Sequence, residues 1–479
     1  MQGRGDPWVS CYKRGMELLR SLLPLGLAAF VGCAGPDAKP VGPGSGSPAA
    51  SAVHERPNIV LLYADAAGWV DFGFQDPAAP DLASLTPNID RIASEGVVCS
   101  RAYMSGVVCS PSRAGMLTGR YQQRFGHENN IPPGYMDGGM DLEQRTIADR
   151  LGDLGYTTGL VGKWHLGYPR GYRPRSRGFD EFYGLLQGSR SYHPIPNVTP
   201  NRVIQRNGEP LPEEGYVTDR FGDAACDFIR ENRDRPFFLF VSYTAPHGPM
   251  HPRKSDEAML AELDIDSPRR RRYVGMVHAM DQNVGRIIEA LQANGLDENT
   301  LVIFTNDNGG QALTGASNGP LRGNKSTVYE GGTRVPMAFR WPGRLTAGER
   351  IDTPVSSLDF MPTFVTISGG DLGEAPHDGR DLMPLLSGSG GFDADRPLFW
   401  RHAGPEGEVA MLEDPWKLVW RRRRDQPPAL YDLSRDPGES TDLAGTEPER
   451  LAAMLEALAQ WESELETPRW GPGSEAAAE

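Results

Sequence analysis

Uninterrupted apolar runs alternate along the chain with segments whose apolar residues recur at helical spacing. The runs IVLLY, TGLV, FFLFV and LVIF, which begin near residues 59, 158, 237 and 301, are typical of strands buried on both faces of a sheet. Between them, TPNIDRIASEG, TIADRLGDLGY and residues 273–294 have the spacing and the start and stop residues of helices. This alternation predicts an α/β domain with a large, mostly parallel or mixed sheet flanked by helices.

The pattern changes at about residue 375, where shorter strands replace the long apolar runs. EVAML, WKLVWR and ALYDL each suit a short strand, and Asp-Pro and Pro-Pro turns separate them. Residues 448–464 then have the spacing of an amphipathic helix. We therefore expect a catalytic α/β domain over residues 56–375 and a small subdomain over residues 376–479, in which an antiparallel sheet packs with a terminal helix.

The first residues predict export. Lys13, Arg14 and Arg20 precede the apolar run LLPLGLAAFVGC, which is too short to span a bilayer comfortably. The run ends at Phe30–Cys33, which resembles a bacterial lipobox, although Phe30 stands where Leu is usual. We predict a signal peptide or lipobox over residues 1–33 and a flexible Pro/Gly/Ser tether over residues 34–55. The expected location is the periplasm or, through a lipid anchor on Cys33, the outer membrane or cell surface of a bacterium; secretory cleavage without lipidation is the alternative.

Charge and cysteine content restrict the partners and the covalent framework. The formal net charge is -14, which argues against nucleic-acid binding, because phosphate neutralisation needs a basic surface. An anionic substrate stays possible, since a site needs only a locally positive lining. Of the five cysteines, Cys11 and Cys33 fall in the leader. The remaining three are an odd number, which predicts no disulfide framework and at least one free thiol.

Polar side chains follow the apolar runs at the points where the strands should end. Because the carboxyl ends of parallel strands share one edge of a sheet, and ligands bind at that edge in open α/β folds, we expect these side chains to form one site. They are Asp65, Lys163, His165, His247, Asp307 and Asn308.

The pentapeptide GVVCS occurs twice, and only its second copy is followed by PSR. There, Ser110 suits a helix N-cap and Pro111 the first helical position. Cys109 would then lie at the positive end of a helix, with Arg113 one turn further, and these surroundings favour an anion. Cys99 lacks such a start signal and is predicted to be a buried strand residue. The residues alone leave open whether Cys109 is functional.

The segment CSPSRAGMLTGR resembles the signature of the type I, formylglycine-dependent sulfatase family, which belongs to the alkaline phosphatase superfamily. Other motifs match that family in order along nearly all of the chain after the leader: RPNIVLLYAD, TPNIDRIASEG, GKWHLG, APHGPMH, FTNDNGG, LRGNKSTVYEGG and LYDLSRDPGE. The resemblance implies that a formylglycine-generating enzyme oxidises Cys109 to formylglycine (3-oxoalanine) during maturation. The hydrated aldehyde carries two hydroxyls, one to attack sulfur and the other to expel sulfate.

The resemblance also implies catalytic roles for five cationic residues. Arg113 would orient the formylglycine, and Lys163 would stabilise its alkoxide. His165 would act as the base that triggers elimination of sulfate. His247 and Lys325 would contact the sulfate, and one of them would protonate the leaving oxygen.

A hard cation is implied by the oxygen ligands at the same edge. By resemblance, Asp65, Asp307, Asn308 and the modified Cys109 would bind Ca²⁺, with Mg²⁺ as the other candidate. One residue departs from the family, which usually has a second Asp where this chain has Ala66. The loss of that carboxylate predicts a weaker metal site.

The substrate is the least determined part of the prediction. His127 and His193 lie on loops where this family usually contacts the group that carries the sulfate, although loop packing would explain them equally well. We expect a sulfated saccharide as substrate. A phosphonate or phosphate ester hydrolase of the same superfamily is one alternative function. A glycan-binding protein with a degenerate site is another, suggested by Ala66 alone.

Overall fold

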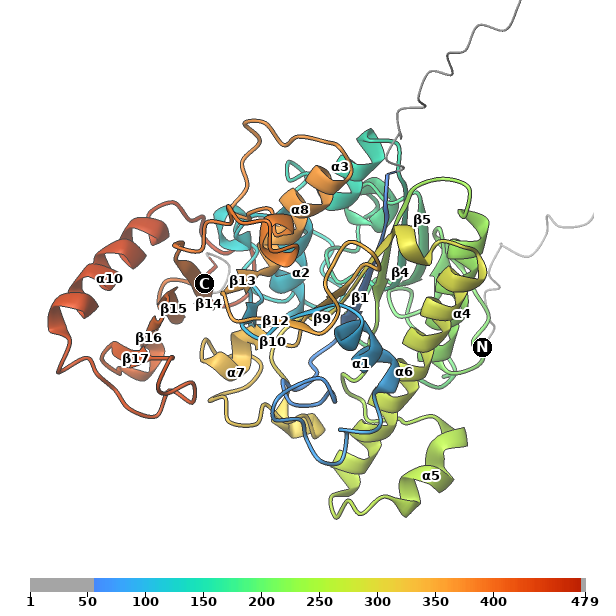
Figure 1. Cartoon of the computed structure of the whole chain (residues 1–479), viewed down its shortest axis with the longest axis horizontal. Helices are drawn as coiled ribbons and strands as arrows, with labels where there is room; N and C mark the ends of the chain where they lie inside the picture. Colours follow the sequence, from blue (N-terminus) through green and yellow to red (C-terminus); the bar gives the residue numbers. More distant parts are fainter. Residues whose placement is uncertain (1–55, 475–479) are drawn as a thin grey trace, which may run out of the picture. The chain divides into compact units, whose positions relative to one another are not determined.

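The computed structural model describes residues 56–474, and the apolar runs form the centre of its large mixed sheet (Figure 1). This sheet has 10 strands in the order β12-β2-β11-β9-β1-β8-β4-β5-β6-β7. Its central strands are parallel to one another: β9 (Thr300–Asn306), β1 (Asn58–Ala64), β8 (Phe237–Ser242), β4 (Thr157–Lys163) and β5 (Glu181–Leu185). Antiparallel pairs join its outer strands: β2 (Val97–Cys99), β11 (Ala338–Arg340), β6 (Gln205–Arg206) and β7 (Glu209–Pro210), with β12 (Glu349–Ile351) at one edge. The expected α/β sheet is confirmed.

Helices cover both faces of this sheet, which explains why its strands are apolar throughout. In β1, Ile59 and Leu61 pack with residues of one helical layer, while Val60 and Leu62 pack with residues of the other. The first layer contains α2 (Cys109–Thr118), α3 (Ile147–Asp153) and α8 (Phe360–Ile367). The second contains α1 (Pro87–Ser94), α4 (Val217–Glu231) and α6 (Pro268–Ala293).

A second, smaller antiparallel sheet follows in the sequence, with the expected terminal helix packed on it. The strands are β14 (Leu398–His402), β15 (Glu408–Glu413), β16 (Trp416–Arg421) and β17 (Ala429–Asp432), and the helix is α10 (Pro448–Glu462). In β15, Val409 and Met411 pack with residues of α10, whereas Ala410 and Leu412 face segments of the large domain. A three-stranded sheet of β3 (Ala102–Tyr103), β10 (Arg334–Val335) and β13 (Val355–Ser356), and the short helices α5 (Glu257–Glu262), α7 (Glu330–Thr333) and α9 (Met383–Leu386), complete the framework.

The start of one helix differs from the sequence prediction, and several elements, among them α4, α8 and β14, were not predicted. The long helix α6 begins at Pro268, before the expected residue 273, because Ser267 caps it by accepting a hydrogen bond from the Arg270 N–H at 3.3 Å. Strand β14 was not expected, although the Gly-, Ser- and Asp-rich segment that ends at Pro397 is a turn signal directly before it. The division into two parts at residues 375 and 376 stays a prediction.

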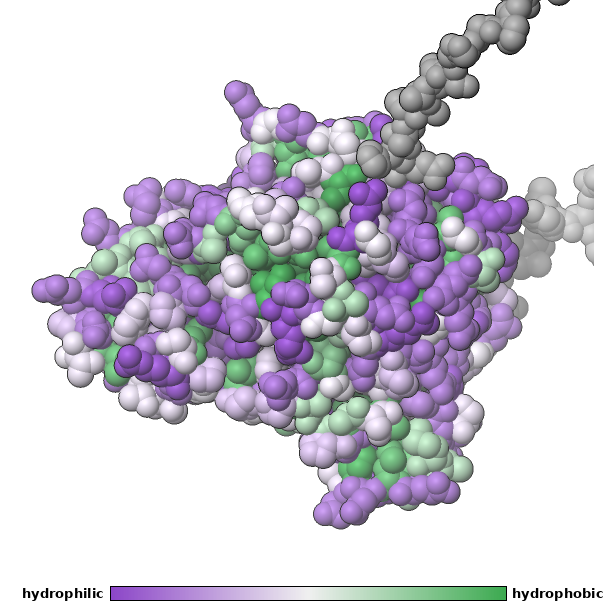
Figure 2. Space-filling view, in the orientation of Figure 1, coloured by the Kyte–Doolittle hydropathy of each residue, from purple (hydrophilic) through white to green (hydrophobic). Residues whose placement is uncertain are grey.

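The predicted leader (residues 1–33), tether (34–55) and Cys33 lipidation site lie outside the described residues, and these assignments stay predictions. Within residues 56–474, no helix has both the length and the apolar composition needed to cross a membrane. Figure 2 shows that polar residues cover most of the visible face and that hydrophobic residues gather there in small patches, one of them around α5.

Candidate active site

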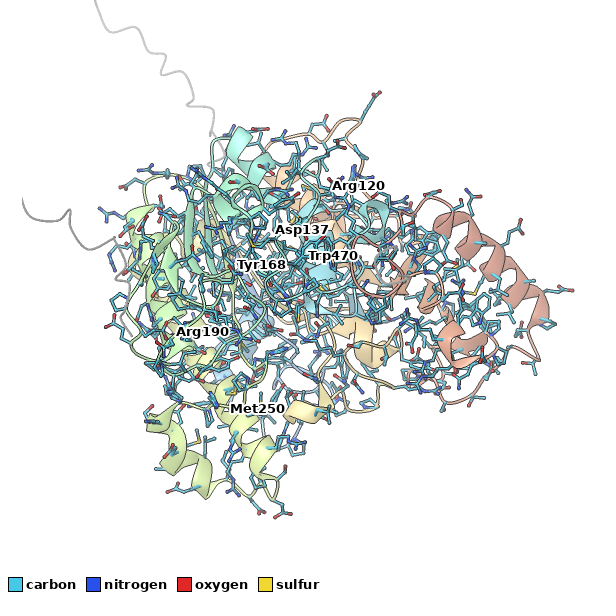
Figure 3. The ribbon with its side chains drawn as sticks, turned by 180° about the vertical axis from the view of Figure 1, so that it is seen from behind. Arg120, Asp137, Tyr168, Arg190, Met250 and Trp470 are labelled. Atoms are coloured by element: carbon cyan, nitrogen blue, oxygen red, sulfur yellow. The ribbon has the colours of Figure 1, made fainter. Side chains whose placement is uncertain are left out.

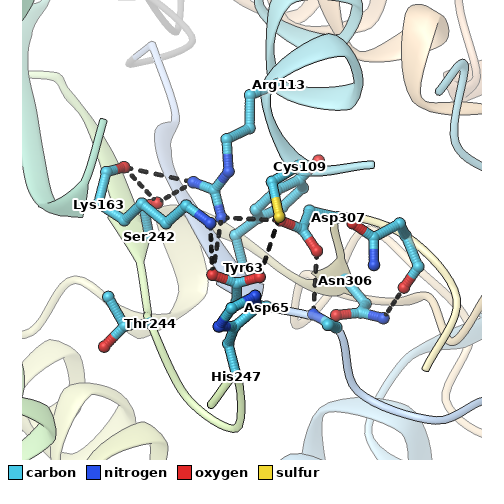
Figure 4. Close-up of polar contacts among 12 residues, drawn as sticks. Tyr63, Asp65, Cys109, Arg113, Lys163, Ser242, Thr244, His247, Asn306 and Asp307 are labelled. Carbon is cyan, nitrogen blue, oxygen red and sulfur yellow. Dashed lines mark hydrogen bonds and ion pairs between the residues drawn. The ribbon is translucent and has the colours of Figure 1, made fainter. Parts of the chain in front are cut away.

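Four neighbouring parallel strands deliver polar side chains to one edge of the large sheet. Asp65 follows β1 directly, Asp307 follows β9, Lys163 ends β4, and His247 lies in the loop after β8. Since these strands pair in the order β9-β1-β8-β4, their carboxyl ends are adjacent. Figure 4 shows the result, with Asp65, Asp307, Lys163 and His247 gathered around the sulfur of Cys109.

Helix α2 presents Cys109 at its N-terminal end, as the sequence predicts, but the cap differs from the expected one. The helix begins at Cys109 itself, and Val108 occupies the cap position. The Ser110 hydroxyl instead donates to the carbonyl of His165 at 2.8 Å, while the Ser110 N–H donates to Asn130 at 2.9 Å. Ser110 therefore ties the start of α2 to two loops rather than capping the helix.

The Cys109 thiol lies between positive and negative groups. Its Sγ is 2.9 Å from the Lys325 Nζ and 3.5 Å from the Asp65 Oδ1. Burial raises the pKa of the thiol, and the carboxylates of Asp307 and Asp65 raise it further, more than the neighbouring lysines lower it. The unmodified thiol therefore stays protonated and is a poor nucleophile.

Arg113, one turn along α2, is almost fully buried and contacts both sides of the site. Its Nη2 donates to the Asp307 Oδ2 at 3.1 Å, and its Nη1 donates to Ser242 and to the Lys163 carbonyl at 3.3 Å. The guanidinium also lies 5.2 Å from the centre of the Tyr63 ring. Arg113 thus links α2 to the ends of β9, β8 and β4.

Asp65 and Lys163 form a fully buried ion pair, with 2.6 Å between Oδ2 and Nζ. Burial raises the pKa of Asp65, but the positive charges of Lys163, Lys325 and Arg113 lower it and contribute to holding the pKa well below its usual value. Asp65 is therefore ionised across the physiological pH range.

Two histidines complete the polar lining. Burial lowers the pKa of His165 well below its usual value, and the charges of Lys163 and Arg113 lower it further. Burial also lowers the pKa of His247, against the raising effect of Asp65. The His247 Nδ1 lies 2.8 Å from the Gly248 carbonyl and must donate to it, which leaves Nε2 free. Both rings are neutral near pH 7 and can accept a proton.

A cavity of about 240 Å³ opens over these groups. Its lining includes Cys109, Lys163, His165 and His247 from the expected site, together with Asn130, Ile131, Pro133, Tyr168, Gln187, Gly188, Ser189 and Arg202. The second set comes from loops after α2, β4 and β5 and was not predicted. Figure 3 shows one of its members, Tyr168, near the middle of the face opposite to that in Figure 1.

Neither histidine predicted to contact the substrate lines this cavity. His127 is fully buried, its Nε2 lies 2.6 Å from the Ser110 hydroxyl, and its ring packs edge-on against Trp470. Burial lowers the pKa of His127 to about 3. His193 is half-buried and its Nε2 lies 3.1 Å from the Pro252 carbonyl. These contacts match the alternative of loop packing, and a substrate contact by either residue stays a prediction.

The candidate metal ligands are buried, and one of them has a free oxygen. The Asp307 Oδ1 accepts from the Ala66 N–H at 3.0 Å, and the Asn308 Oδ1 has no hydrogen-bond partner among the described residues. A buried amide oxygen without a partner suits a cation ligand. Ligand atoms of Asp65, Cys109 and His247 also lie within 4.8 Å of one another. Two carboxylates and an amide oxygen are hard donors, so the residues fit a hard cation such as Ca²⁺ or Mg²⁺.

The C-terminal sheet supports the segments that carry Cys109 and Lys325, which the sequence did not reveal. Val107 and Val108, just before Cys109, pack in one cluster with Val328 and with residues of that sheet such as Trp400. Within the same region, Lys417 of β16 forms a buried ion pair of 2.8 Å with Glu330, which follows the Lys325 loop. No local pattern signals this support, because the paired residues lie far apart in the chain.

Gly188 leaves room for the His165 ring, and we expect Gly188→Ala to impair activity strongly. A Cβ at position 188 would lie 2.5 Å from the His165 Cε1 and 2.8 Å from both ring nitrogens, so the ring would have to move. A misplacement on the order of 1 Å costs about 10²-fold in rate, and we expect kcat to fall by about that factor.

The matched control for this substitution is Gly171→Ala, where a Cβ would meet open space. Steady-state kinetics of both variants, with melting temperatures to monitor folding, checks the prediction. Unchanged kcat in a folded Gly188→Ala protein would show that the His165 position is not critical.

Known proteins resemble this chain over most of its length. Residues 57–370 match the sulfatase family, and residues 323–464 match the family described as N-sulphoglucosamine sulphohydrolase, C-terminal. Arylsulfatase A of Homo sapiens is 33% identical over 465 residues, with 85% of this chain and 87% of the relative covered. N-acetylgalactosamine-6-sulfatase of Canis lupus familiaris is 31% identical over 457 residues, with 85% of each chain covered. The solved structure of Ps i-CgsB in complex with k-i-k-neocarrahexaose is 33% identical in sequence to this chain and has a TM-score of 0.82. The match covers 88% of this chain and 96% of the Ps i-CgsB chain.

Proposed function

The chain belongs to the sulfatase family and is a sulfuric ester hydrolase, and from that premise we propose that it removes sulfate from a sulfated saccharide, with Cys109 converted to formylglycine as the nucleophile. Two relatives support the saccharide part of the proposal. N-acetylgalactosamine-6-sulfatase is named for a sulfated sugar, and the structure of Ps i-CgsB contains k-i-k-neocarrahexaose.

The observation that carries this proposal is the position of Cys109. Its side chain lies at the N-terminal end of α2, with Lys325 at 2.9 Å and the buried Asp65–Lys163 pair beside it, at the base of a cavity open to a ligand. The arrangement supplies positive charge and backbone N–H groups where a sulfate would bind. A buried, protonated thiol would be a poor catalyst there, which favours its conversion to an aldehyde.

Each cationic residue has a role that follows from its contacts. Arg113 is held by Asp307 and orients the side chain at position 109. Lys163, bonded to Asp65, stabilises negative charge on the attacking oxygen. His165 is neutral near pH 7 and can accept the proton whose removal triggers release of sulfate. Lys325, whose Nζ donates to the Cys109 Sγ at 2.9 Å, is placed to donate to a sulfate oxygen or to the leaving oxygen. The free Nε2 of His247 can accept a proton and, once protonated, can donate to the sulfate.

Asp65, Asp307 and Asn308 would hold a hard cation next to position 109. When bound, the ion would polarise a sulfate oxygen and lower the pKa of a coordinated hydroxyl. The chain places Ala66 with φ 59° beside these ligands, a left-handed conformation that alanine rarely adopts and that Asp or Asn tolerates better. The loop therefore has a backbone suited to an Asp but lacks its carboxylate.

We expect the native metal site to be weak and Ala66→Asp to strengthen it. An added carboxylate raises the negative charge around the ion, a main determinant of Ca²⁺ affinity, and we expect the dissociation constant to fall by about tenfold or more. The measurement is a calcium titration by calorimetry, together with the rise in melting temperature that a bound ion produces.

Ala66→Asn is the matched control, since it has a similar shape and backbone preference but no charge. It should change Ca²⁺ affinity much less than Ala66→Asp does. Equal, tight binding by the wild type and both variants would mean that another group already supplies the missing ligand, and would contradict the weak-site prediction.

The experiment that tests the function uses protein produced together with a formylglycine-generating enzyme. Mass spectrometry of the peptide that carries Cys109 should show a CHO group in place of CH₂SH, while Cys99 stays a thiol. The same preparation should hydrolyse 4-nitrophenyl sulfate and members of a panel of defined sulfated saccharides. Faster turnover of 4-nitrophenyl phosphate would favour a phosphate ester hydrolase, and saccharide binding without any turnover would favour a glycan-binding protein.

A further inference from the structure

Arg202 lines the active-site cavity without a negatively charged partner. Within the described chain, no carboxylate lies within ion-pair distance of its guanidinium, although the chain carries a net charge of -14. The neighbouring Arg190 shows the usual arrangement, since its Nη1 lies 3.0 Å from the Glu213 Oε1 and its Nη2 pairs with the other oxygen. An unpaired guanidinium in a cavity is available to a ligand.

The position of Arg202 is fixed by its neighbours. The N–H groups of Leu186 and Gln187 donate to the carbonyl of Asn201, and Arg190 donates to the Arg202 carbonyl at 3.0 Å. With its side-chain oxygen turned toward Arg202, Gln187 accepts from Nη2 at 3.1 Å and from Nε at 3.2 Å. One edge of the guanidinium is thereby engaged, and the edge formed by Nη1 and Nη2 keeps free donors.

Tyr168 supplies a second unused donor in the same cavity. Its side chain is fully buried, and its hydroxyl has no hydrogen-bond partner among residues 56–474. A buried hydroxyl without a partner is costly unless a ligand or water satisfies it. Figure 3 shows Tyr168 near the centre of its face, with the paired Arg190 below it.

The remaining lining carries no charge of its own to meet this arginine. Outside the residues proposed for catalysis, Arg202 is the charged member of a cavity lining otherwise made of neutral residues such as Asn130, Ile131 and Ser189. The reacting sulfate already has its own cationic groups in Lys163 and Lys325. The charge of Arg202 is therefore left for another part of the substrate.

We propose that Arg202 and Tyr168 form a subsite for a second anionic group, a sulfate or a carboxylate, on the same saccharide. This inference rests on the proposed function, because it places the second anion on the sugar whose ester sulfate lies at Cys109. The guanidinium edge binds two oxygens of that anion, and the Tyr168 hydroxyl donates to one of them. The cavity of about 240 Å³ is smaller than the roughly 300–1,000 Å³ of drug-sized ligand sites, so it holds one sugar unit with both anions.

The test compares saccharides that carry one or two anionic groups, and two of them, N-acetylgalactosamine 6-sulfate and its 4,6-disulfate, differ only in the second anion. In a Cys109→Ala background, which prevents turnover, calorimetry measures binding of N-acetylgalactosamine 6-sulfate, its 4,6-disulfate and a uronic acid 2-sulfate. We expect at least one of the two doubly anionic ligands to bind about tenfold or more tighter than the monosulfate, a difference of about 1.4 kcal/mol. The relative affinities of the disulfate and the uronic acid 2-sulfate indicate whether the subsite prefers a sulfate or a carboxylate.

Substitution of Arg202 should remove that preference. Arg202→Gln should bind all three ligands with similar affinity, and Arg202→Lys, which keeps the charge but not the planar edge, should fall between. Arg206→Gln, an exposed arginine on β6, is the matched control and should keep the preference. Equal preference in the parent and in Arg202→Gln, or no preference in the parent, would overturn the proposal.

Activity distinguishes failure of this inference from failure of the proposed function. With Cys109 intact, Arg202→Gln should lose kcat/KM about tenfold or more on a doubly anionic saccharide and should lose clearly less on 4-nitrophenyl sulfate, since that substrate has no second anion. An equal loss on both substrates would mean that Arg202 serves the reacting sulfate and would overturn the subsite. If the wild type itself does not hydrolyse sulfate esters, the proposed function fails, whereas the calorimetric comparison still decides whether the anion subsite exists.

Discussion

Replacing Cys109 by Ser is expected to abolish multiple turnover, with a fall in kcat of about 10⁴-fold or more, the scale seen when an enzyme loses its nucleophile. Serine has one hydroxyl, which can attack sulfur but leaves no second hydroxyl on the same carbon to expel the sulfate. The site around it should remain intact, because Asp65, Lys163 and Lys325 keep their places. Mass spectrometry after incubation with substrate should show either a protein heavier by one SO₃ group or no reaction.

Cys226→Ser is the matched control for that experiment. Cys226 is a half-buried thiol on α4, and its Sγ lies 3.6 Å from the Arg286 carbonyl, outside the active-site cavity. Its replacement should leave kcat unchanged. Steady multiple turnover by Cys109→Ser would mean that neither the thiol nor its proposed aldehyde is needed.

Arg113→Met is expected to cost both stability and activity. The guanidinium is 1% exposed and is 3.1 Å from Asp307 and 3.9 Å from Asp65, so its removal leaves a buried carboxylate without its cationic partner. Breaking a buried pair in this way costs about 3–5 kcal/mol, and we expect the free energy of unfolding to fall by about that amount. The value of kcat should fall by about 10³-fold, because position 109 loses the group that orients it.

Chemical denaturation and steady-state kinetics measure these two effects separately. Arg424→Met is the control, since Arg424 is exposed at the turn after β16 and its loss should cost under about 0.5 kcal/mol. Arg113→Lys keeps the charge but cannot reach Ser242, Asp307 and the Lys163 carbonyl together, and should recover stability more than activity. Wild-type kcat in Arg113→Met would contradict the orienting role.

The framework of the fold could be predicted because its signals are local. The apolar runs of β1, β4, β8 and β9 need cover on both faces, and helices with a single apolar side lie between them in the sequence. The small sheet and α10 were predicted from short strands and turn residues in the same way. Strand β14 and the true start of α6 were missed although both have local signals, the turn residues that end at Pro397 and the pair Ser267 and Pro268.

The sequence by itself determined which polar residues belong to one site. Asp65, Lys163, His247 and Asp307 each follow an apolar strand, and parallel strands necessarily end at one edge, so their convergence is a consequence of topology. The signature around Cys109 added the helix start and Arg113. The strand ends and the start of α2 do not depend on the conformation of the loops, and they can therefore be recognised in the linear sequence.

Only the tertiary structure decided what surrounds that site. His127 contacts the Ser110 hydroxyl and does not line the cavity. Gly188 leaves space for the His165 ring. Arg202 lines the cavity, and Gln187 accepts hydrogen bonds from one edge of its guanidinium. Each of these contacts joins loops whose paths are set by packing across the whole domain rather than by propensity within a few residues. The reacting centre is therefore encoded by strand ends that a periodic pattern reveals, whereas the groups that select a substrate are placed by long-range contacts that leave no pattern in the sequence.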